Sequence, residues 1–224
     1  MKHDDPKENI LNAATKVFAA RGFRDATIRQ ICAEANVNVS MVNYHFKTKE
    51  RLYAEVVRRL FSFMLGEDMA RIAEGVHDAR SWRAAVRRFV ERFVGYFSVT
   101  KEPGIFAARI FRWEVTRPSS ICRELQLTYG RLAYEGFNRL LAMAEDDPVR
   151  LRVWSGTIWG QIAVLLLVDD QWLGFFNPPD MSREDWGRRI ADNLCESIFK
   201  SLTYKDGVAR QGAGRRARPV GQLA

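Results

Sequence analysis

Cysteine and histidine are scarce, with three residues of each in a chain of 224. Cys32, Cys122 and Cys195 are far apart and odd in number, which excludes a disulfide framework and the closely spaced ligands of a zinc site. Cys32 falls on the apolar side of a predicted helix, where a buried thiol behaves as a small hydrophobic side chain. We therefore expect no bound metal ion and a protein of the reducing cytoplasm.

Long hydrophobic runs are missing as well. The most apolar stretch, residues 153–168, is interrupted by serine, threonine, glutamine and two glycines. It is also shorter than the roughly 18–20 residues that a membrane span needs. A buried helix explains this stretch better, and no membrane partner is expected. The N-terminus is polar and acidic, unlike a secretory signal.

Catalytic motifs are absent too. The chain has no Ser/His/Asp ordering, no glycine-rich phosphate loop and no metal-binding cluster. Its histidines, His3, His45 and His77, do not stand beside a plausible nucleophile. We therefore expect no enzymatic activity and no cofactor.

Positive charge is in excess, with a formal net charge of +8. Such an excess favours a polyanionic partner, and nucleic acid before a membrane surface. Part of it lies in residues 205–224, a Gly- and Arg-rich tail with few apolar residues. A segment of this composition is expected to be disordered.

Helical periodicity dominates the chain, and no run alternates apolar and polar residues as a half-buried strand would. Residues 10–18 carry an apolar stripe, and Gly22 stands where a helix C-cap is expected. Thr27 opens a capping box, followed by a short amphipathic helix over residues 28–35. Asn36 comes next, and asparagine tolerates the left-handed backbone of a tight turn. The sequence thus predicts an all-α fold.

A second short helix is predicted from Val39 to Phe46, with Asn38 as its N-cap, and Thr48 then caps a longer helix. The helices at 28–35 and 39–46 have the proportions of a helix-turn-helix unit. In such a unit the second helix needs an apolar back and a small or polar front, because the front enters the major groove of DNA.

Helical spacing over residues 39–46 predicts this division. Val39, Val42 and Phe46 share one arc and would form the buried back. The opposite side and its flanks carry Ser40, Met41, Asn43, Tyr44 and His45.

Two runs in this region resemble the N-terminal domain of the TetR family of transcriptional regulators. They are TIRQICAEANV at 27–37 and YHFKTKERLY at 44–53, and the resemblance covers about residues 7–55. Two positions depart from the family pattern, because Asn43 replaces a common aromatic residue and Val39 a common polar one.

The resemblance implies a two-domain protein. Residues 1–50 would form the three-helix helix-turn-helix DNA-binding domain, and residues 51–204 a larger helical domain for ligand binding and dimerisation; the tail at 205–224 would be disordered. The function implied is that of a transcriptional repressor, which binds a palindromic DNA operator as a homodimer and is released by a small hydrophobic or aromatic effector. The alternative is a ligand-independent architectural or division-linked DNA-binding protein on the same scaffold.

The matching positions also imply roles for single residues. Thr27 and Lys49 would hold phosphates, Lys49 with the help of a helix N-terminus. Tyr44 and His45 would touch the DNA backbone or sugar, and Arg29 would reach a base edge such as that of guanine. The alternatives are a solvated surface charge for Arg29 and core packing for Tyr44. The whole expected DNA-binding set is Thr27, Arg29, Asn38, Ser40, Met41, Asn43, Tyr44, His45 and Lys49.

The remainder of the chain reads as a second helical block. Pro103 and Pro148 can each start a helix, and one helix is predicted from Pro118 through Leu141. Ser182 opens the last helix.

Dimerisation is expected through the last two long helices. Gly156 and Gly160 form a ridge of small residues that allows close helix approach, and Ile190, Leu194 and Ile198 would line the partner helix. The alternative for all five is the core of a single chain.

Residues 82–172 are rich in aromatic side chains. A cavity among them with a few polar groups would suit a hydrophobic or aromatic ligand. The expected contacts are Phe106, Arg109, Trp113, Trp159 and Gln161.

Overall fold

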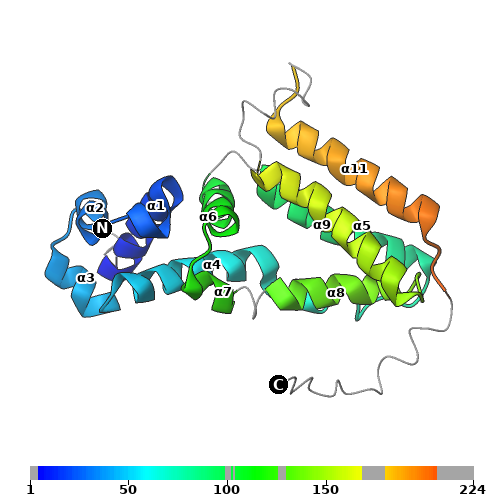
Figure 1. Cartoon of the computed structure of the whole chain (residues 1–224), viewed down its shortest axis with the longest axis horizontal. Helices are drawn as coiled ribbons and strands as arrows, with labels where there is room; N and C mark the ends of the chain where they lie inside the picture. The colour runs from blue at the N-terminus through cyan, green and yellow to red at the C-terminus, as the bar shows by residue number, and fades with distance from the viewer. Residues whose placement is uncertain (1–4, 99–101, 103, 126–129, 168–179, 206–224) are drawn as a thin grey trace.

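Every regular element that the computed structural model describes is a helix (Figure 1). The description covers residues 5–98, 102, 104–125, 130–167 and 180–205, so the predicted helix start at Pro103 and the tail at 206–224 lie outside it. The all-α fold class is confirmed. In chain order the helices are α1 (Pro6–Asp25), α2 (Ile28–Ala35), α3 (Val39–Phe46), α4 (Lys49–Ala70), α5 (Ala79–Ser98), α6 (Gly104–Thr116), α7 (Ser120–Leu125), α8 (Arg131–Ala142), α9 (Pro148–Leu167) and α11 (Arg183–Ser201).

Helix α1 is the centre of the N-terminal group of helices. Ile10, Ala14 and Phe18 are fully buried there, and α1 packs against α2, α4 and α6. Gly22, inside the span of α1, has non-helical φ and ψ of 73° and 171°. The chain therefore leaves the helix at the residue where the sequence predicts a C-cap.

Helix α4 joins this group to the rest of the molecule (Figure 1). Thr48 caps it by accepting a hydrogen bond from the N–H of Arg51 at 3.2 Å. Its first half buries Leu52, Tyr53 and Val56, and the ring of Tyr53 meets that of Phe18 edge-on at 4.8 Å. The expected domain division at residue 50 thus falls in the first turn of α4, and it stays a proposal.

Helix α5 is the centre of the second group. Its residues Trp82, Val86, Val90 and Phe93 are buried, and Phe89 stacks on Phe137 of α8 with ring centroids 4.2 Å apart. The indole Nε1 of Trp82 donates to the carbonyl of Leu140 at 2.7 Å. Helix α11 lies along α5 (Figure 1).

One predicted helix is described only in part. The element expected from Pro118 through Leu141 is represented by α7 and α8, and residues 126–129 between them lie outside the described residues. Gly130, directly before α8, has helical φ and ψ of −64° and −36°. Leu132 is 46% exposed, so it does not extend a continuous buried stripe.

Helix α9, predicted to be buried, is covered on one side only. Ile158 and Ile162 are 1% exposed, whereas Val149, Val153 and Val164 are 67%, 62% and 48% exposed. Since a helix that is apolar all round is normally buried all round, the open side of α9 needs an explanation. No helix of the described residues is long and apolar enough to span a bilayer.

Candidate nucleic-acid interface

Local hydrogen bonds define both helices of the helix-turn-helix unit. At the start of α2, Thr27 Oγ1 accepts from the N–H of Gln30 at 3.3 Å, and Gln30 Oε1 accepts from the N–H of Thr27 at 3.0 Å. Asn36 ends α2 in the left-handed region with φ 52° and ψ 47°. Asn38 Oδ1 then accepts from the N–H of Met41 at 2.9 Å and starts α3. The predicted capping box, turn and N-cap are all confirmed.

One side of helix α3 is buried against the rest of the protein, and the opposite side is exposed to solvent. Val42 and Phe46 are 1% and 5% exposed, whereas Met41 and Tyr44 are 36% and 73% exposed. The exposure of Tyr44 rules out the alternative that its ring packs in the core. The prediction that Val39 belongs to the buried back is wrong, because its side chain is 43% exposed. Val39 is the first residue of α3, and a side chain there points toward the helix N-terminus, away from the core that Phe46 enters.

The polar residues of the expected DNA-binding set lie mostly in the open. The exposed members are Thr27, Arg29, Asn38, Ser40 and Asn43, and His45 is partly covered. In these caps the side chains of Thr27 and Asn38 act only as hydrogen-bond acceptors. The Thr27 hydroxyl proton and the Asn38 side-chain N–H groups take no part in them. Arg29 is exposed, which is compatible both with a contact to a base edge and with a solvated surface charge.

Lys49 is engaged within the chain. Its Nζ donates to the carbonyl oxygen of Ala26 at 2.9 Å and to that of Arg24 at 3.4 Å. The same ammonium lies 4.7 Å from the centroid of the Phe23 ring. Lys49 thus holds the turn before α2, and of its three donors one is left for a phosphate.

Sequence reasoning missed two residues of this surface. Val39 adds an exposed apolar group beside Met41. Lys47, which is not in the expected DNA-binding set, is exposed with its Nζ 5.7 Å from the centre of the Tyr44 ring. A cation at the end of α3 beside an exposed tyrosine could have been recognised from its position in the sequence.

A buried polar cluster connects α4 with α6 and α7. The carboxylate of Glu114, 3% exposed, accepts from the hydroxyl of Tyr53 at 2.5 Å and from the N–H of Ser119 at 2.7 Å. Burial first, and then the hydrogen bond to Glu114, raise the pKa of Tyr53 far above its ordinary value. Burial, followed by the charge of Glu114, likewise raises the pKa of Cys122. Tyr53 therefore stays protonated and remains a donor at neutral pH.

The cysteines behave as the sequence predicts, because all three are free and buried. Within the described residues no group of three His, Cys, Asp or Glu side chains could hold a metal ion.

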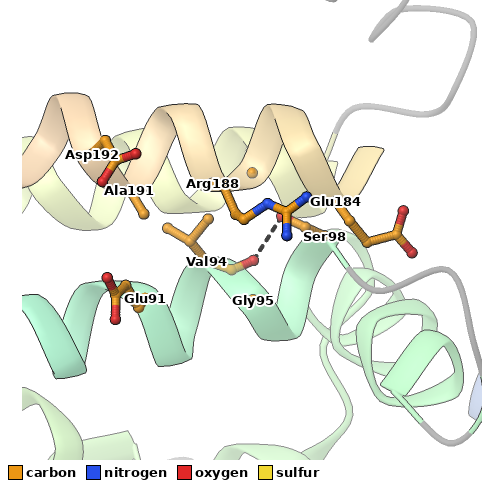
Figure 2. Close-up of a pocket in the computed structure, with 9 residues that line it drawn as sticks. Glu91, Val94, Gly95, Ser98, Glu184, Arg188, Ala191 and Asp192 are labelled. Atoms are coloured by element: carbon orange, nitrogen blue, oxygen red, sulfur yellow. Dashed lines mark hydrogen bonds between the residues drawn. The ribbon is translucent and has the colours of Figure 1, made fainter. Parts of the chain in front are cut away.

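A groove of about 480 Å³ lies between α5 and α11 (Figure 2). Its walls include Val94 and Ser98 of α5 and Arg188 and Ala191 of α11, and the Ser98 hydroxyl donates to the carbonyl of Val94 at 2.7 Å. None of the five side chains predicted to contact a ligand lines this groove.

Those five side chains have different surroundings. Arg109 and Gln161 are exposed, and Phe106 packs partly against the core. Trp113 is engaged with α1, where its Nε1 donates to the carbonyl of Ala19 at 3.2 Å. Trp159 packs edge-on against the rings of Phe89 and Phe93 on α5.

Trp159 is one of the described residues with a buried polar atom that has no hydrogen-bond partner. Its ring centroid lies 5.0 Å from that of Phe93, and its buried Nε1 has no hydrogen-bond partner among the described residues. The same holds for Ser155 Oγ, one turn earlier on α9, for Asn138 Oδ1 and for Arg112 Nε. Buried polar atoms without a partner are costly, so each needs a bound group or a water molecule.

The expected dimer residues divide between surface and core. Gly156 and Gly160 are exposed on α9, and an added Cβ at either would meet nothing within 4 Å. Leu194 and Ile198 are 2% and 0% exposed within the single chain, so they pack in its own core and are not free to line a partner helix. Ile190 is half-buried.

The capped α2–α3 unit with its open front is that of a helix-turn-helix DNA-binding protein. A family model described as "Bacterial regulatory proteins, tetR family" matches residues 10–56. The N-terminal part of the chain is therefore a DNA-binding domain of the TetR family of transcriptional regulators.

Two curated relatives show how far the similarity extends. The HTH-type transcriptional repressor NicS of Pseudomonas putida is 39% identical over 59 residues, which are 26% of this chain and 28% of NicS. The probable HTH-type transcriptional regulator YttP of Bacillus subtilis is 25% identical over 123 residues, 55% of this chain and 56% of YttP. The chain therefore matches between about a quarter and a half of the length of these relatives.

Solved structures show that the fold extends beyond the matched domain. FadR from Bacillus subtilis, in complex with stearoyl-CoA, has a TM-score of 0.61 at 14% identity and covers 85% of this chain and 98% of its own. AibR, in complex with isovaleryl coenzyme A and operator DNA, has a TM-score of 0.62 at 16% identity and covers 87% of this chain and 98% of its own. At these identities the likeness shows the fold alone.

Proposed function

We propose that the protein is a transcriptional repressor that binds a palindromic operator as a homodimer and is released by a small hydrophobic or aromatic effector. The observation that carries the proposal is the front of α3, where Tyr44 is 73% exposed while Val42 and Phe46 are buried behind it. This division leaves an aromatic ring and small polar side chains exposed on the side of α3 that could enter a major groove.

The contacts proposed for DNA follow from chemistry and exposure. Arg29 has the fork that pairs with guanine, and Met41 and Val39 offer apolar contact to thymine methyl groups. Thr27, Asn38 and Lys47 surround this surface with donors suited to phosphates. The same role is proposed for the remaining members of the expected set, Ser40, Asn43, His45 and Lys49.

The open side of α9 supports the proposed homodimer. Val149, Val153, Gly156, Gly160 and Val164 follow one another at intervals of three or four residues and so lie on one side of the helix. The valines are exposed and the two glycines leave room for a second backbone. A second α9 would cover this side, and two copies of α3 could then read successive turns of the duplex, roughly 34–36 Å apart.

The unpartnered atoms around Trp159 support an effector site in the larger domain. Trp159 Nε1 is a donor without an acceptor and its ring lies beside that of Phe93, and Arg112 Nε on α6 is a second such donor. A carbonyl or carboxylate oxygen of an otherwise apolar molecule would satisfy such a donor. The acyl-CoA complexes of FadR and AibR make acyl thioesters reasonable first probes. Release by the effector would be a population shift between two packings of the dimer.

Selection of duplexes from a random-sequence library tests the DNA-binding part. We expect the wild-type protein to enrich a palindrome, and Arg29→Ala to bind it ten- to hundredfold more weakly with relaxed specificity at one base pair, since a base contact contributes about 1–3 kcal/mol. Tyr44→Ala should also bind more weakly, whereas Tyr134→Ala, which removes a ring 44% exposed on α8, serves as the matched control. Wild-type selectivity in the Arg29→Ala, Tyr44→Ala double variant would contradict the proposal.

Titration of the selected complex with stearoyl-CoA, isovaleryl-CoA and a panel of aromatic acids tests the effector. A compound that binds the free dimer should weaken DNA binding by the same factor by which DNA weakens its own binding. Unchanged DNA affinity with every compound, together with many binding sites on a chromosome, would instead favour a ligand-independent architectural protein.

A further inference from the structure

We propose that Trp113 and Glu114 of α6 are positioning residues for DNA binding, which hold the turn between α1 and α2 and with it Thr27 and Arg29. The inference rests on the proposed DNA-binding function and adds to it the residues through which the larger domain reaches the reading surface. These two neighbours in sequence contact the N-terminal helices at two separate points, Trp113 on α1 and Glu114 on α4.

The first point is the contact of Trp113 with the end of α1. The indole Nε1 donates to the carbonyl of Ala19 at 3.2 Å. Its ring lies so close to Gly22 that an added Cβ there would be 3.1 Å from Trp113 Cδ2. Arg117 flanks the contact, with its guanidinium 5.8 Å from the Trp113 ring and 3.8 Å from the carboxylate of Asp25.

The space left between α1 and α6 is very small. The crevice lined by residues 21–25 together with Trp113, Glu114, Arg117 and Ser119 measures about 10 Å³. Such a volume is at the lower limit for a single water molecule. A shift of α6 toward α1 therefore has little free space in this crevice and would press on the end of α1.

The second point begins at Glu114 and reaches the start of α2 through direct contacts. Glu114 accepts from the hydroxyl of Tyr53 at 2.5 Å, and the Tyr53 ring lies 4.8 Å from the ring of Phe23. Phe23 lies 4.7 Å beneath the ammonium of Lys49, which donates to the carbonyl of Ala26 at 2.9 Å. Ala26 directly precedes Thr27, the N-cap of α2.

Both points thus bear on the same short segment. Residues 22–26 lie between the Trp113 contact and the Thr27 cap, and the Lys49 bonds end on carbonyls of this segment. Thr27 and Arg29 are exposed just beyond it and are proposed to contact phosphate and base. Their placement on DNA is therefore set by side chains of α6 that do not themselves reach the duplex.

Two variants weaken this connection at one point each. Trp113→Phe removes the N–H that binds Ala19 and part of the ring that faces Gly22. Tyr53→Phe removes the hydroxyl that binds Glu114 but keeps the ring on Phe23. Trp82→Phe is the matched control, because it removes the same kind of indole-to-carbonyl bond, to Leu140, inside the larger domain.

Binding of the selected duplex is measured by fluorescence anisotropy over a series of KCl concentrations. Trp113→Phe and Tyr53→Phe should each lower the affinity about tenfold, within the range typical of coupling between distant sites. The slope of log affinity against log salt should also fall by about one, the change expected when one phosphate contact is lost. Trp82→Phe should keep the wild-type affinity and slope. Equal affinities and equal salt slopes for all three variants would overturn the proposal.

Hydrogen exchange without DNA gives an independent readout. The amides of residues 27–31 should exchange faster in Trp113→Phe and in Tyr53→Phe than in Trp82→Phe at matched global stability. If the wild-type protein selects no duplex, the proposed function fails while this measurement still decides the connection. Unchanged exchange at these amides in both variants would refute it.

Discussion

Gly22 is constrained both by its backbone conformation and by its close contact with Trp113. Its φ of 73° with ψ of 171° lies in a region that is essentially restricted to glycine. An added Cβ would also lie 3.1 Å from Trp113 Cδ2, a tight contact that the ring could relieve only by shifting. The residue that ends the regular part of α1 is thus also the residue that lets α6 approach.

Gly22→Ala should therefore lower the free energy of unfolding by about 1–3 kcal/mol, because the backbone conformation itself is strained for alanine. Gly75→Ala is the control, since an added Cβ at Gly75 meets nothing within 4 Å. Urea denaturation followed by circular dichroism measures both. Equal midpoints for the two variants would show that Gly22 is not constrained.

At the scale of single helices, side-chain caps define the N-terminal ends of α2, α3, α4 and α11. Thr27, Asn38, Thr48 and Ser182 each accept a hydrogen bond from an N–H of the following first turn. At α11, the Ser182 hydroxyl accepts from the N–H of Asp185 at 3.0 Å and donates to its carboxylate at 2.6 Å. This hydrogen bond, followed by the one from Arg188, lowers the pKa of Asp185.

Ser182→Ala should destabilise the protein by about 1 kcal/mol, as the loss of an N-cap does. Because the pKa of Asp185 is lowered in the folded state, its ionised form adds stability above its ordinary pKa of 3.8 and loses it as the pH falls through the lowered value. The variant should therefore raise the pKa of Asp185, which a carboxyl NMR titration measures. Ser197→Ala, within the same helix, is the control, since Ser197 only donates to the carbonyl of Asn193 and the change should stay within about 0.5 kcal/mol.

At the scale of the whole molecule, one uncovered apolar face remains on α9. Val153 is 62% exposed there, and Gly156 and Gly160 leave open space beside it. Helix α11 contributes its buried residues Leu194 and Ile198 to its own chain, where it packs on α5. A dimer built on α9 would explain both the exposed valines and the glycine spacing.

Val153→Glu should convert the proposed dimer into a monomer, since each copy would bury a carboxylate in an apolar interface. Sedimentation velocity measures the oligomeric state, and affinity for the selected duplex should fall about a hundredfold when the two reading helices are no longer linked. Val115→Glu places the same charge on a valine that is 45% exposed on α6, and that protein should stay dimeric. If the Val153→Glu protein stayed dimeric, the dimer interface would not lie on this side of α9.

The helix-turn-helix unit could be predicted from sequence because its determinants are local. The Thr27–Gln30 capping box, the left-handed Asn36 and the Asn38 cap each connect residues within four positions of one another. The boundaries of α3 follow from them, as does the exposed front with Tyr44. The same reasoning was wrong for Val39, because burial of a first-turn residue depends on which neighbouring element happens to reach it.

The tertiary structure decided what residues far apart in the chain do together. Trp113 contacts Ala19 and Glu114 contacts Tyr53 across 94 and 61 positions, and helical periodicity, which repeats within a few residues, carries no information on such pairs. Periodicity likewise marks Leu194, Ile198 and Val153 as apolar but does not tell a core from an interface. Only the packing of α11 on α5 assigns the first two to the interior and leaves the side of α9 with Val153 uncovered.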